Sequence, residues 1–292
     1  MYKTTMVQPT RKSTWVSMSQ NPPKPIDAIR GAFLVFVSLL VLVPLAWLVL
    51  SSFKTQSELG QRPPSLLPES FGLDNYTEAL ESFGFATYLT NSVIVTLGAT
   101  LLTLVINSMA AYAFAKFNFR GKDFLFILTL STIMIPIQVI LIPIYQVVAA
   151  FGMVNTYWGL IIPAAATPTG VFLLRQYMLN IPDELIEAAR IDGMGEFRLF
   201  LTIILPLTKP ALAVLAIFSI IWRWNDFLWP LIVAQDSSLY TLPVAIALFN
   251  SQLVVPFNLV LSMSVLTILP VIIIFLFLQR SIVTGIAQTG LK

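Results

Sequence analysis

A compact group of polar and aromatic residues between positions 219 and 226 carries the clearest chemistry in this sequence. Ser219, Arg223 and Asp226 are spaced i, i+4 and i+7, which would place them on one face of a helix. Trp222 and Asn225 mark an adjacent face. Proteins hold sugars by stacking aromatic rings against them and by offering planar polar groups to their hydroxyls. The mixture therefore predicts a translocation path for a carbohydrate.

Other interpretations of this cluster stay open. Arg223 and Asp226 can neutralise each other as an i, i+3 pair, and the tryptophans can form an interfacial belt. Arg223 also suits an anionic solute, such as a uronate oligosaccharide or a glycerol phosphate. On another span Gln138 and Tyr145 share a face, where they either line the path or join helices by hydrogen bonds. The predicted path residues are Gln138, Tyr145, Ser219, Trp222, Arg223, Trp224, Asn225 and Asp226.

Residue types that perform catalysis are scarce. The chain has no cysteine and no histidine, which excludes disulfides, thiol catalysis, zinc–thiolate sites and a Ser-His-Asp triad. Gly121-Lys122-Asp123 lacks the earlier glycine and the following Ser or Thr of a phosphate loop, so the chain is not expected to bind ATP. Asp226 alone cannot supply an acid/base pair within the membrane. We expect no catalytic residue, metal or cofactor on this chain.

The elements that must position these residues are membrane spans. The chain is 57% hydrophobic and 11% charged, whereas soluble domains carry about 25% charged residues. A spanning helix needs about 20 apolar residues. An all-α, polytopic protein with six transmembrane helices is predicted, with spans near residues 31–52, 88–115, 124–150, 157–179, 211–233 and 259–278. Prolines interrupt the third and fourth.

Lysine and arginine indicate the orientation. With the N-terminus inside, fourteen of these residues lie on the inner side, only Lys54 and Arg62 lie outside, and Arg223 falls within a span. Both termini are therefore expected in the cytoplasm. The predicted order is a cytoplasmic segment 1–30, a first span 31–52, an extracytoplasmic loop 53–87, a core 88–280 with a cytoplasmic loop at 180–206, and a cytoplasmic tail 281–292. The small net charge of +3 does not favour a nucleic-acid partner.

The loop at 180–206 is charged and compact between two apolar segments. Asn180 is predicted to cap a short helix, with Pro182 in its first turn. Leu185, Ala188 and Ala189 are predicted to form an apolar stripe beside a charged one. Gly193 permits the left-handed turn that ends a helix, and a second helix is expected from about residue 194. Such an exposed element suits docking to a cytoplasmic protein, although an ordinary interfacial loop explains it equally well from composition.

The order of residues in this loop resembles a known motif. The cytoplasmic loop of importer-type ABC permeases has a characteristic pattern, which this loop resembles. It reads Glu-Ala-Ala, three residues, Gly, nine residues, Ile, one residue and Leu-Pro. Several further passages are similar to the maltose-type carbohydrate permeases, and to their second, MalG-like subunit. They are Asn91-Ser92, Ala-Tyr-Ala-Phe-Ala-Lys at 111–116, Phe119-Arg120-Gly121, Met134-Ile135-Pro136, Leu141-Ile142-Pro143, residues 172–176, Trp-Asn-Asp-Phe-Leu-Trp-Pro at 224–230 and the tail from Gln279. The resemblance covers residues 30–292.

The resemblance implies a type I ABC importer permease fold in a bacterial cytoplasmic (inner) membrane. It implies a second homologous permease, a homodimeric ABC ATPase that binds ATP and Mg, and an extracytoplasmic solute-binding protein that delivers a sugar. Glu187 would enter the ATPase cleft, and Gly193 would form the turn between two coupling helices. The ATPase-coupling residues are Glu187, Ala188, Ala189, Asp192, Gly193, Leu205 and Pro206. In some relatives the tail, here after Arg280, also touches the ATPase.

Two other classes of protein make different predictions. A self-sufficient secondary transporter or channel needs an ion relay in the membrane, for which Asp226 is the only deeply placed carboxylate. It would take up solute in proteoliposomes that contain this chain alone. An intramembrane enzyme needs a nucleophile and base or paired carboxylates, which the spans do not supply. The permease predicts instead that uptake depends on ATP and on a separate ATPase.

Overall fold

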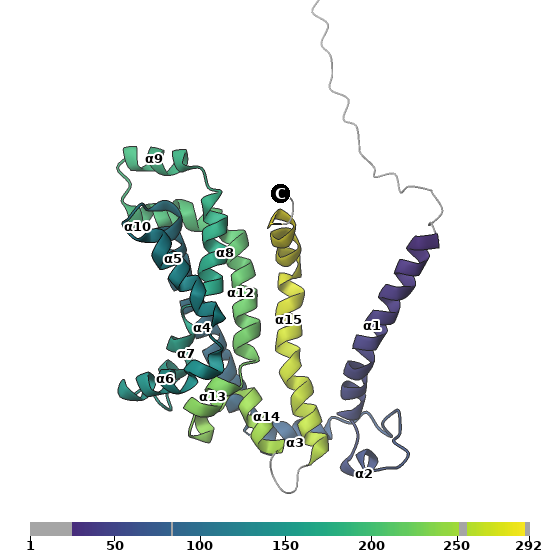
Figure 1. Cartoon of the computed structure of the whole chain (residues 1–292). Helices are drawn as coiled ribbons and strands as arrows, with labels where there is room; N and C mark the ends of the chain where they lie inside the picture. The colour runs from purple at the N-terminus through teal and green to yellow at the C-terminus, as the bar shows by residue number, and fades with distance from the viewer. Residues whose placement is uncertain (1–24, 83, 251–255, 290–292) are drawn as a thin grey trace, which may run out of the picture. The chain divides into compact units, whose positions relative to one another are not determined.

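The computed structural model describes residues 25–82, 84–250 and 256–289 of the chain (Figure 1). Every regular element in these ranges is a helix. The described residues divide after Trp47 into two compact units, and each unit is described by itself. Most of α1 (Pro25–Ser51) belongs to the first unit, and its segment Ile29–Ser51 is long and apolar enough to cross a membrane.

The second unit contains the remaining helices. Its longer members are α3 (Asp74–Ser82), α4 (Phe85–Lys116), α5 (Lys122–Ser131), α6 (Ile137–Ala150), α8 (Pro168–Leu179), α9 (Asp183–Ile191), α12 (Lys209–Trp224), α14 (Leu242–Asn250) and α15 (Phe257–Thr289). Shorter turns connect them: α2 (Gln56–Leu59), η1 (Thr132–Met134), α7 (Tyr157–Ile161), η2 (Ile162–Ala164), α10 (Glu196–Leu199), η3 (Phe200–Ile204), α11 (Leu205–Leu207), α13 (Leu228–Val233) and η4 (Ser237–Leu239).

The described residues hold three to six candidate membrane spans. Ile29–Ser51, Phe85–Lys116 and Phe257–Leu276 qualify as single helices. Three pairs qualify only when each bent pair is taken as one span. The pair α5–η1 and α6 is bent by 108°, the pair α7–η2 and α8 by 47°, and the pair α10–α11 and α12 by 79°. Two of these pairs coincide with the predicted spans 124–150 and 157–179, whereas the third breaks at Thr208, before the predicted span 211–233.

Proline explains where the predicted spans at 124–150 and 211–233 stop being single helices. Pro136 disfavours the helical conformation at Ile135, whose φ and ψ are −87° and 116°. The predicted third span therefore turns sharply before α6. The predicted fifth span ends as a single helix at Trp224, six residues before Pro230, which removes the helical N–H donor to the carbonyl of Asp226. Residues 228–233 form the separate helix α13.

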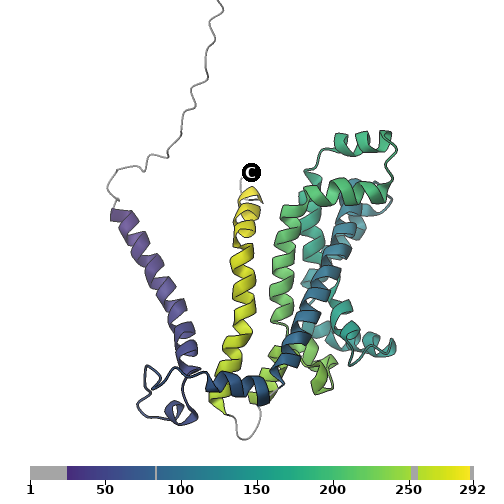
Figure 2. The ribbon, with the colours of Figure 1, turned by 180° about the vertical axis from the view of Figure 1, so that it is seen from behind.

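α4 is the central helix of the second unit. α8 and α12 pack along it, and α15 packs against α12 and α3 (Figures 1 and 2). Its buried face is rich in small and polar residues, which lets the neighbouring backbones approach closely. One buried cluster joins α4 to α8, α9, η3 and α12, and a second joins it to α7, α13 and η4.

The second unit has two distinct ends. α9 and α10 lie at the end where α15 finishes, and α3, α6, α13 and α14 lie at the opposite end (Figures 1 and 2). The predicted coupling loop and the last described turn of α15 are therefore on the same side of the unit.

Candidate functional site

α9 is a short exposed helix that contains Glu187, Ala188 and Ala189, the first three residues of the predicted coupling motif. It begins at Asp183, with Pro182 as its N-cap residue, and Asp183 and Glu184 lie in its first turn. The negative charges of these two side chains interact favourably with the positive end of the helix dipole. The prediction that Asn180 caps this helix is wrong. Asn180 instead ends α8, where its side chain donates to the carbonyl of Gln176 at 2.9 Å. α9 is thus separated from α8 by only three residues.

Lys116 attaches the first turn of α9 to the end of α4. Its ammonium donates to the carbonyl of Ile181 at 2.6 Å and to Asp183 Oδ1 at 2.7 Å. The lysine side chain is only 4% exposed, whereas that of Asp183 is 73% exposed. The hydrogen bond and charge of Lys116 lower the pKa of Asp183 below its ordinary value of 3.8. The ion pair is therefore present throughout the neutral range.

Tyr112 attaches the other end of α9, through Glu196 at the start of α10. The tyrosine hydroxyl donates to Glu196 Oε2 at 2.9 Å, and Arg190 Nε donates to Glu196 Oε1 at 2.7 Å. The glutamate raises the pKa of Arg190 above its usual high value. The tyrosine ring packs between Phe117 and Phe200 at centroid distances of 5.2 and 5.4 Å. Both ends of α9 are therefore tied to one helix.

The two attachment points share a face of α4. Tyr112 and Lys116 are four residues apart, so their side chains stand one above the other. Between them Ile186 and Ala189 of α9 are buried in the cluster that also holds residues of α4, α8, η3 and α12. A displacement of α9 must consequently be passed to α4 and the helices packed on it.

Gly193 forms the turn after α9, as predicted for the motif. Its φ is +77°, and the N–H of Met194 donates to the carbonyl of Ala189 at 3.0 Å. These are features of a Schellman-type helix end, in which glycine avoids the clash of a Cβ. The chain then runs through α10, the π-helical turn η3 and α11, which contains Leu205 and Pro206.

The predicted apolar stripe of α9 is divided between its two faces. Ala189 points into the core with Ile186, while Leu185 and Ala188 are exposed. The three residues fall within one arc of the helix, but only Ala189 is buried, because the face of α9 that packs on the core contains Ile186 and Ala189. Glu187, Ala188 and Asp192 face outward, and Ile191 and Phe197 extend this outer surface at 86% and 67% exposure.

The predicted path cluster near residue 223 does not share a helical face. α12 ends at Trp224, so Asp226 lies beyond it and accepts a bond from the N–H of Trp229 at 3.5 Å. Ser219 is buried against α4, where its hydroxyl lies 3.0 Å from that of Thr100. Within the described ranges Arg223 forms no ion pair with Asp226, and it donates instead to the carbonyl of Ala164 at 2.9 Å.

The aromatic and amide members of the predicted path have different surroundings. Trp224 is buried, and its indole N–H donates to the carbonyl of Thr267 on α15 at 3.1 Å, so it joins helices instead of lining a path. Trp222 is 49% exposed and stacks on Phe218. Asn225 is exposed and donates to the carbonyl of Ile221, in the last turn of its own helix, at 2.8 Å.

Gln138 and Tyr145 lie on α6, two turns apart. Gln138 is exposed, whereas Tyr145 is partly buried beside α13 and accepts a bond from Gln235 at 3.2 Å. The structure therefore separates the predicted path residues into exposed ones, namely Gln138, Trp222 and Asn225, and ones that hold helices together, namely Ser219, Tyr145 and Trp224.

Sequence reasoning missed the residues that anchor α9. Tyr112 and Lys116 belong to the passage Ala-Tyr-Ala-Phe-Ala-Lys, which was used only as a family resemblance. A tyrosine and a lysine four residues apart at the end of a span, among small alanines, are a signal that could have identified them. Their partners lie about 65 to 84 positions further along the chain and cannot be read from local pattern.

Known proteins resemble this chain along most of its length. Residues 104–288 match the family described as binding-protein-dependent transport system inner membrane component. The chain is 37% identical over 260 residues to the arabinooligosaccharides transport system permease protein AraQ of Halalkalibacterium halodurans, which covers 88% of this chain and 93% of that protein. It is 32% identical over 278 residues to the sn-glycerol-3-phosphate transport system permease protein UgpE of Brucella abortus, with 91% and 98% covered.

A solved structure has the same fold. A chain in the crystal structure of a bacterial ABC transporter involved in the import of the acidic polysaccharide alginate superposes with a TM-score of 0.80 at 22% identity, over 87% of this chain and 95% of that one. The prediction of an all-helical importer-permease fold is confirmed. Because the family match covers more than half of the residues, this chain belongs to the inner-membrane permeases of binding-protein-dependent ABC importers.

Proposed function

We propose that this chain is one of two homologous permease subunits that pass a carbohydrate into the cytoplasm. An extracytoplasmic solute-binding protein delivers the sugar, and a homodimeric ABC ATPase supplies the energy by binding ATP and Mg. Membership of the permease family supports the general scheme. The relative named as an arabinooligosaccharide permease, at 37% identity, supports a sugar or oligosaccharide as the solute.

The observation that carries the proposal is the double attachment of α9. Its outer surface presents Glu187, Ala188 and Asp192, while its ends are bonded to Lys116 and, through Glu196, to Tyr112. An ATPase that grips the outer surface would thus move α4 directly. Because α8 and α12 pack along α4, the movement would reach the spans that contain the candidate path.

The charge distribution supports an orientation with α9 in the cytoplasm. The lysines and arginines of the described second unit concentrate in segments at the α9 end, which include Lys116, Lys122, Arg175, Arg190 and Arg198. Cytoplasmic loops carry such an excess in membrane proteins. On this orientation both termini are cytoplasmic, and the loop between α1 and α4 faces the solute-binding protein.

Reconstitution of the complete transporter tests the proposal. The chain, its partner permease and the ATPase are placed in proteoliposomes, and uptake of arabinose oligosaccharides is measured with the binding protein and ATP. Glu187→Lys should abolish ATP-driven uptake while the complex still assembles in the membrane. Asp27→Lys, an equal charge reversal of an exposed carboxylate in the first turn of α1, is the control and should transport normally. Gradient-driven uptake by this chain alone would overturn the proposal.

An anionic solute is a second candidate, and one observation favours it. The Nε of Arg223 is buried and has no hydrogen-bond partner in the described part of the chain. A carboxylate or phosphate that reached this nitrogen would satisfy it. The relative named as a glycerol-3-phosphate permease is consistent with this alternative. Arg223→Ala should then reduce uptake of glycerol 3-phosphate far more than it reduces assembly, whereas equal losses would remove the idea.

A further inference from the structure

The break in the fourth span is held by side chains from two other helices. Pro168 has no N–H, so it cannot donate to the carbonyl of Ala164, four residues earlier. That carbonyl instead accepts two bonds, from Thr103 Oγ1 at 3.2 Å and from Arg223 Nη2 at 2.9 Å. Thr103 belongs to α4 and Arg223 to α12. One carbonyl therefore joins three spans.

A second contact fixes the other side of the break. The N–H of Thr167 donates to Asn107 Oδ1 at 3.1 Å, and Asn107 Nδ2 donates to Thr167 Oγ1 at 2.6 Å. Asn107 lies one turn from Thr103 on the same face of α4, and both residues are fully buried. Gly170 leaves room for this contact, since a Cβ there would clash with the Asn107 amide. We call Thr103, Asn107 and Arg223 the polar latch.

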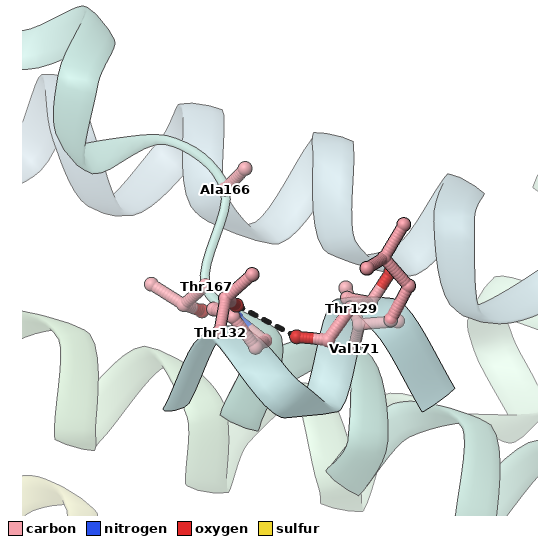
Figure 3. A pocket seen from close by; sticks show the side chains of 7 residues that line it. Thr129, Thr132, Ala166, Thr167 and Val171 are labelled. Carbon is pink, nitrogen blue, oxygen red and sulfur yellow. Dashed lines mark hydrogen bonds between the residues drawn. The ribbon is translucent and has the colours of Figure 1, made fainter. Parts of the chain in front are cut away.

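A pocket lies beside the break. A pocket of about 390 Å³ is lined by residues of α5, η1, the break and α8 (Figure 3). Ala166 and Thr167 line this pocket, together with Thr129 and Thr132. A non-helical segment with open space beside it can move without displacing close-packed side chains. Non-helical backbone inside a span persists only where other groups satisfy its hydrogen bonds, which is what the polar latch does.

From these contacts we propose that residues 165–167 are a hinge of the transport cycle and that the polar latch holds the hinge in the conformation seen here. Release of the latch lets the segment move toward the pocket and changes the angle between α7–η2 and α8. Thr103, Asn107 and Arg223 are positioning residues in this scheme, because they act through the hinge. The inference rests on the proposed function in one respect, namely that ATP drives a conformational change of these spans.

The test uses the absence of cysteine from the sequence. Ala166→Cys introduces the only thiol of this chain, and the rate of its reaction with a maleimide is measured in the complete transporter in nanodiscs. The rate is compared between the nucleotide-free and the ATP–vanadate-trapped transporter, without solute-binding protein or sugar, so a role in solute binding does not enter. The two rates should differ. Equal rates would show that the segment does not move and would overturn the proposal.

Latch variants in the Ala166→Cys background should shift the nucleotide-free rate toward the trapped rate. Thr103→Val removes one neutral hydrogen bond between spans, for which about a threefold shift in population is expected. Arg223→Met removes a charged donor, for which about a tenfold shift is expected. Thr103→Ser keeps the hydroxyl and should restore the original rate. If all three variants match the parent, the latch does not hold the hinge.

Two further variants separate the latch from a general structural role. Ser108→Ala is the matched control on α4 and should leave the rate unchanged, since among the described residues the Ser108 hydroxyl bonds only to the Val105 carbonyl of its own helix. Pro168→Ala restores the missing N–H donor, so it should cancel the effect of Thr103→Val when the two are combined. Simple addition of the two effects would contradict the proposed geometry. If the maleimide rates refute the hinge but Glu187→Lys still abolishes ATP-driven uptake, the proposed function is not contradicted.

Discussion

Removal of one hydroxyl group tests whether α9 is coupled to the spans through α4. Tyr112→Phe deletes the donor to Glu196 Oε2 and leaves the ring between Phe117 and Phe200. The buried packing of α4 should therefore be unchanged. The variant loosens only the link between α10, which holds Arg190 of α9, and the central helix.

The size of the effect follows from the type of bond. A hydrogen bond to a charged group contributes about 1.5–3 kcal/mol when it is buried. The side chain of Glu196 is 43% exposed and keeps its bond to Arg190, so a contribution below this range, about 1 kcal/mol, is expected. An attachment weakened by about 1 kcal/mol is lost several times more often. Solute transported per ATP hydrolysed should fall by up to about fivefold, with Lys116 still bonding the other end of α9 to α4.

The assay measures ATP hydrolysis and sugar uptake in the same proteoliposomes. Hydrolysis should continue in Tyr112→Phe while uptake per ATP falls, because the ATPase still turns over while one of the two attachments of α9 to α4 is weakened. Tyr177→Phe is the matched control: Tyr177 packs on the same buried cluster, and its hydroxyl bonds to nothing in the described residues. An unchanged ratio of uptake to hydrolysis in Tyr112→Phe would refute the argument that α9 acts through α4.

Further predictions concern the turn, the ion pair and the tryptophans. The pKa of Asp183 is lowered, so its ion pair with Lys116 is kept from pH 7 to pH 5 and is lost only as the pH falls below the ordinary value of 3.8. ATPase binding to α9 should follow the same pH dependence. Asp183→Asn should remove this acid dependence in a binding titration. Gly193→Ala meets no atom within 4 Å but adopts φ +77°, which should cost about 1 kcal/mol and lower the melting temperature of the solubilised complex, with a smaller loss for Gly193→Asn. Trp224→Ala should cost about 3–5 kcal/mol and reduce the folded fraction on size exclusion. Trp222→Ala should change stability by less than about 0.5 kcal/mol, and a fall in its uptake per folded molecule would identify the exposed ring as part of the path.

Several features of the coupling loop could be predicted from residues alone. The acidic first turn of α9, the exposed Glu187 and the left-handed turn at Gly193 all follow from local preferences. The division of Ala188 and Ala189 between two faces could not be predicted, because both are small and apolar. Which of the two is buried depends on how α9 lies against α4 and α8.

The cluster at residues 219–226 shows why spacing was misleading. An i, i+4, i+7 pattern describes a helical face only where the helix continues, and α12 ends at Trp224. The expected neutralisation of Arg223 by Asp226 is absent from the described structure, because the guanidinium turns to the carbonyl that Pro168 leaves without a donor. The position of Pro168 could be read from the sequence. That Arg223, 59 positions away, donates to the carbonyl of Ala164 could not.

The amino-acid sequence by itself determined that the chain is a helical membrane protein, and its lysine and arginine pattern and loop motif indicated a permease with a docking element. These properties depend on hydropathy and on order along the chain, which are local. Tertiary structure alone decided how far three candidate spans are bent, that α9 is bonded at both ends to α4, and that one carbonyl in the fourth span joins α4 and α12. A polar group freed in lipid must find a partner, and which distant side chain can reach it depends on how the helices pack.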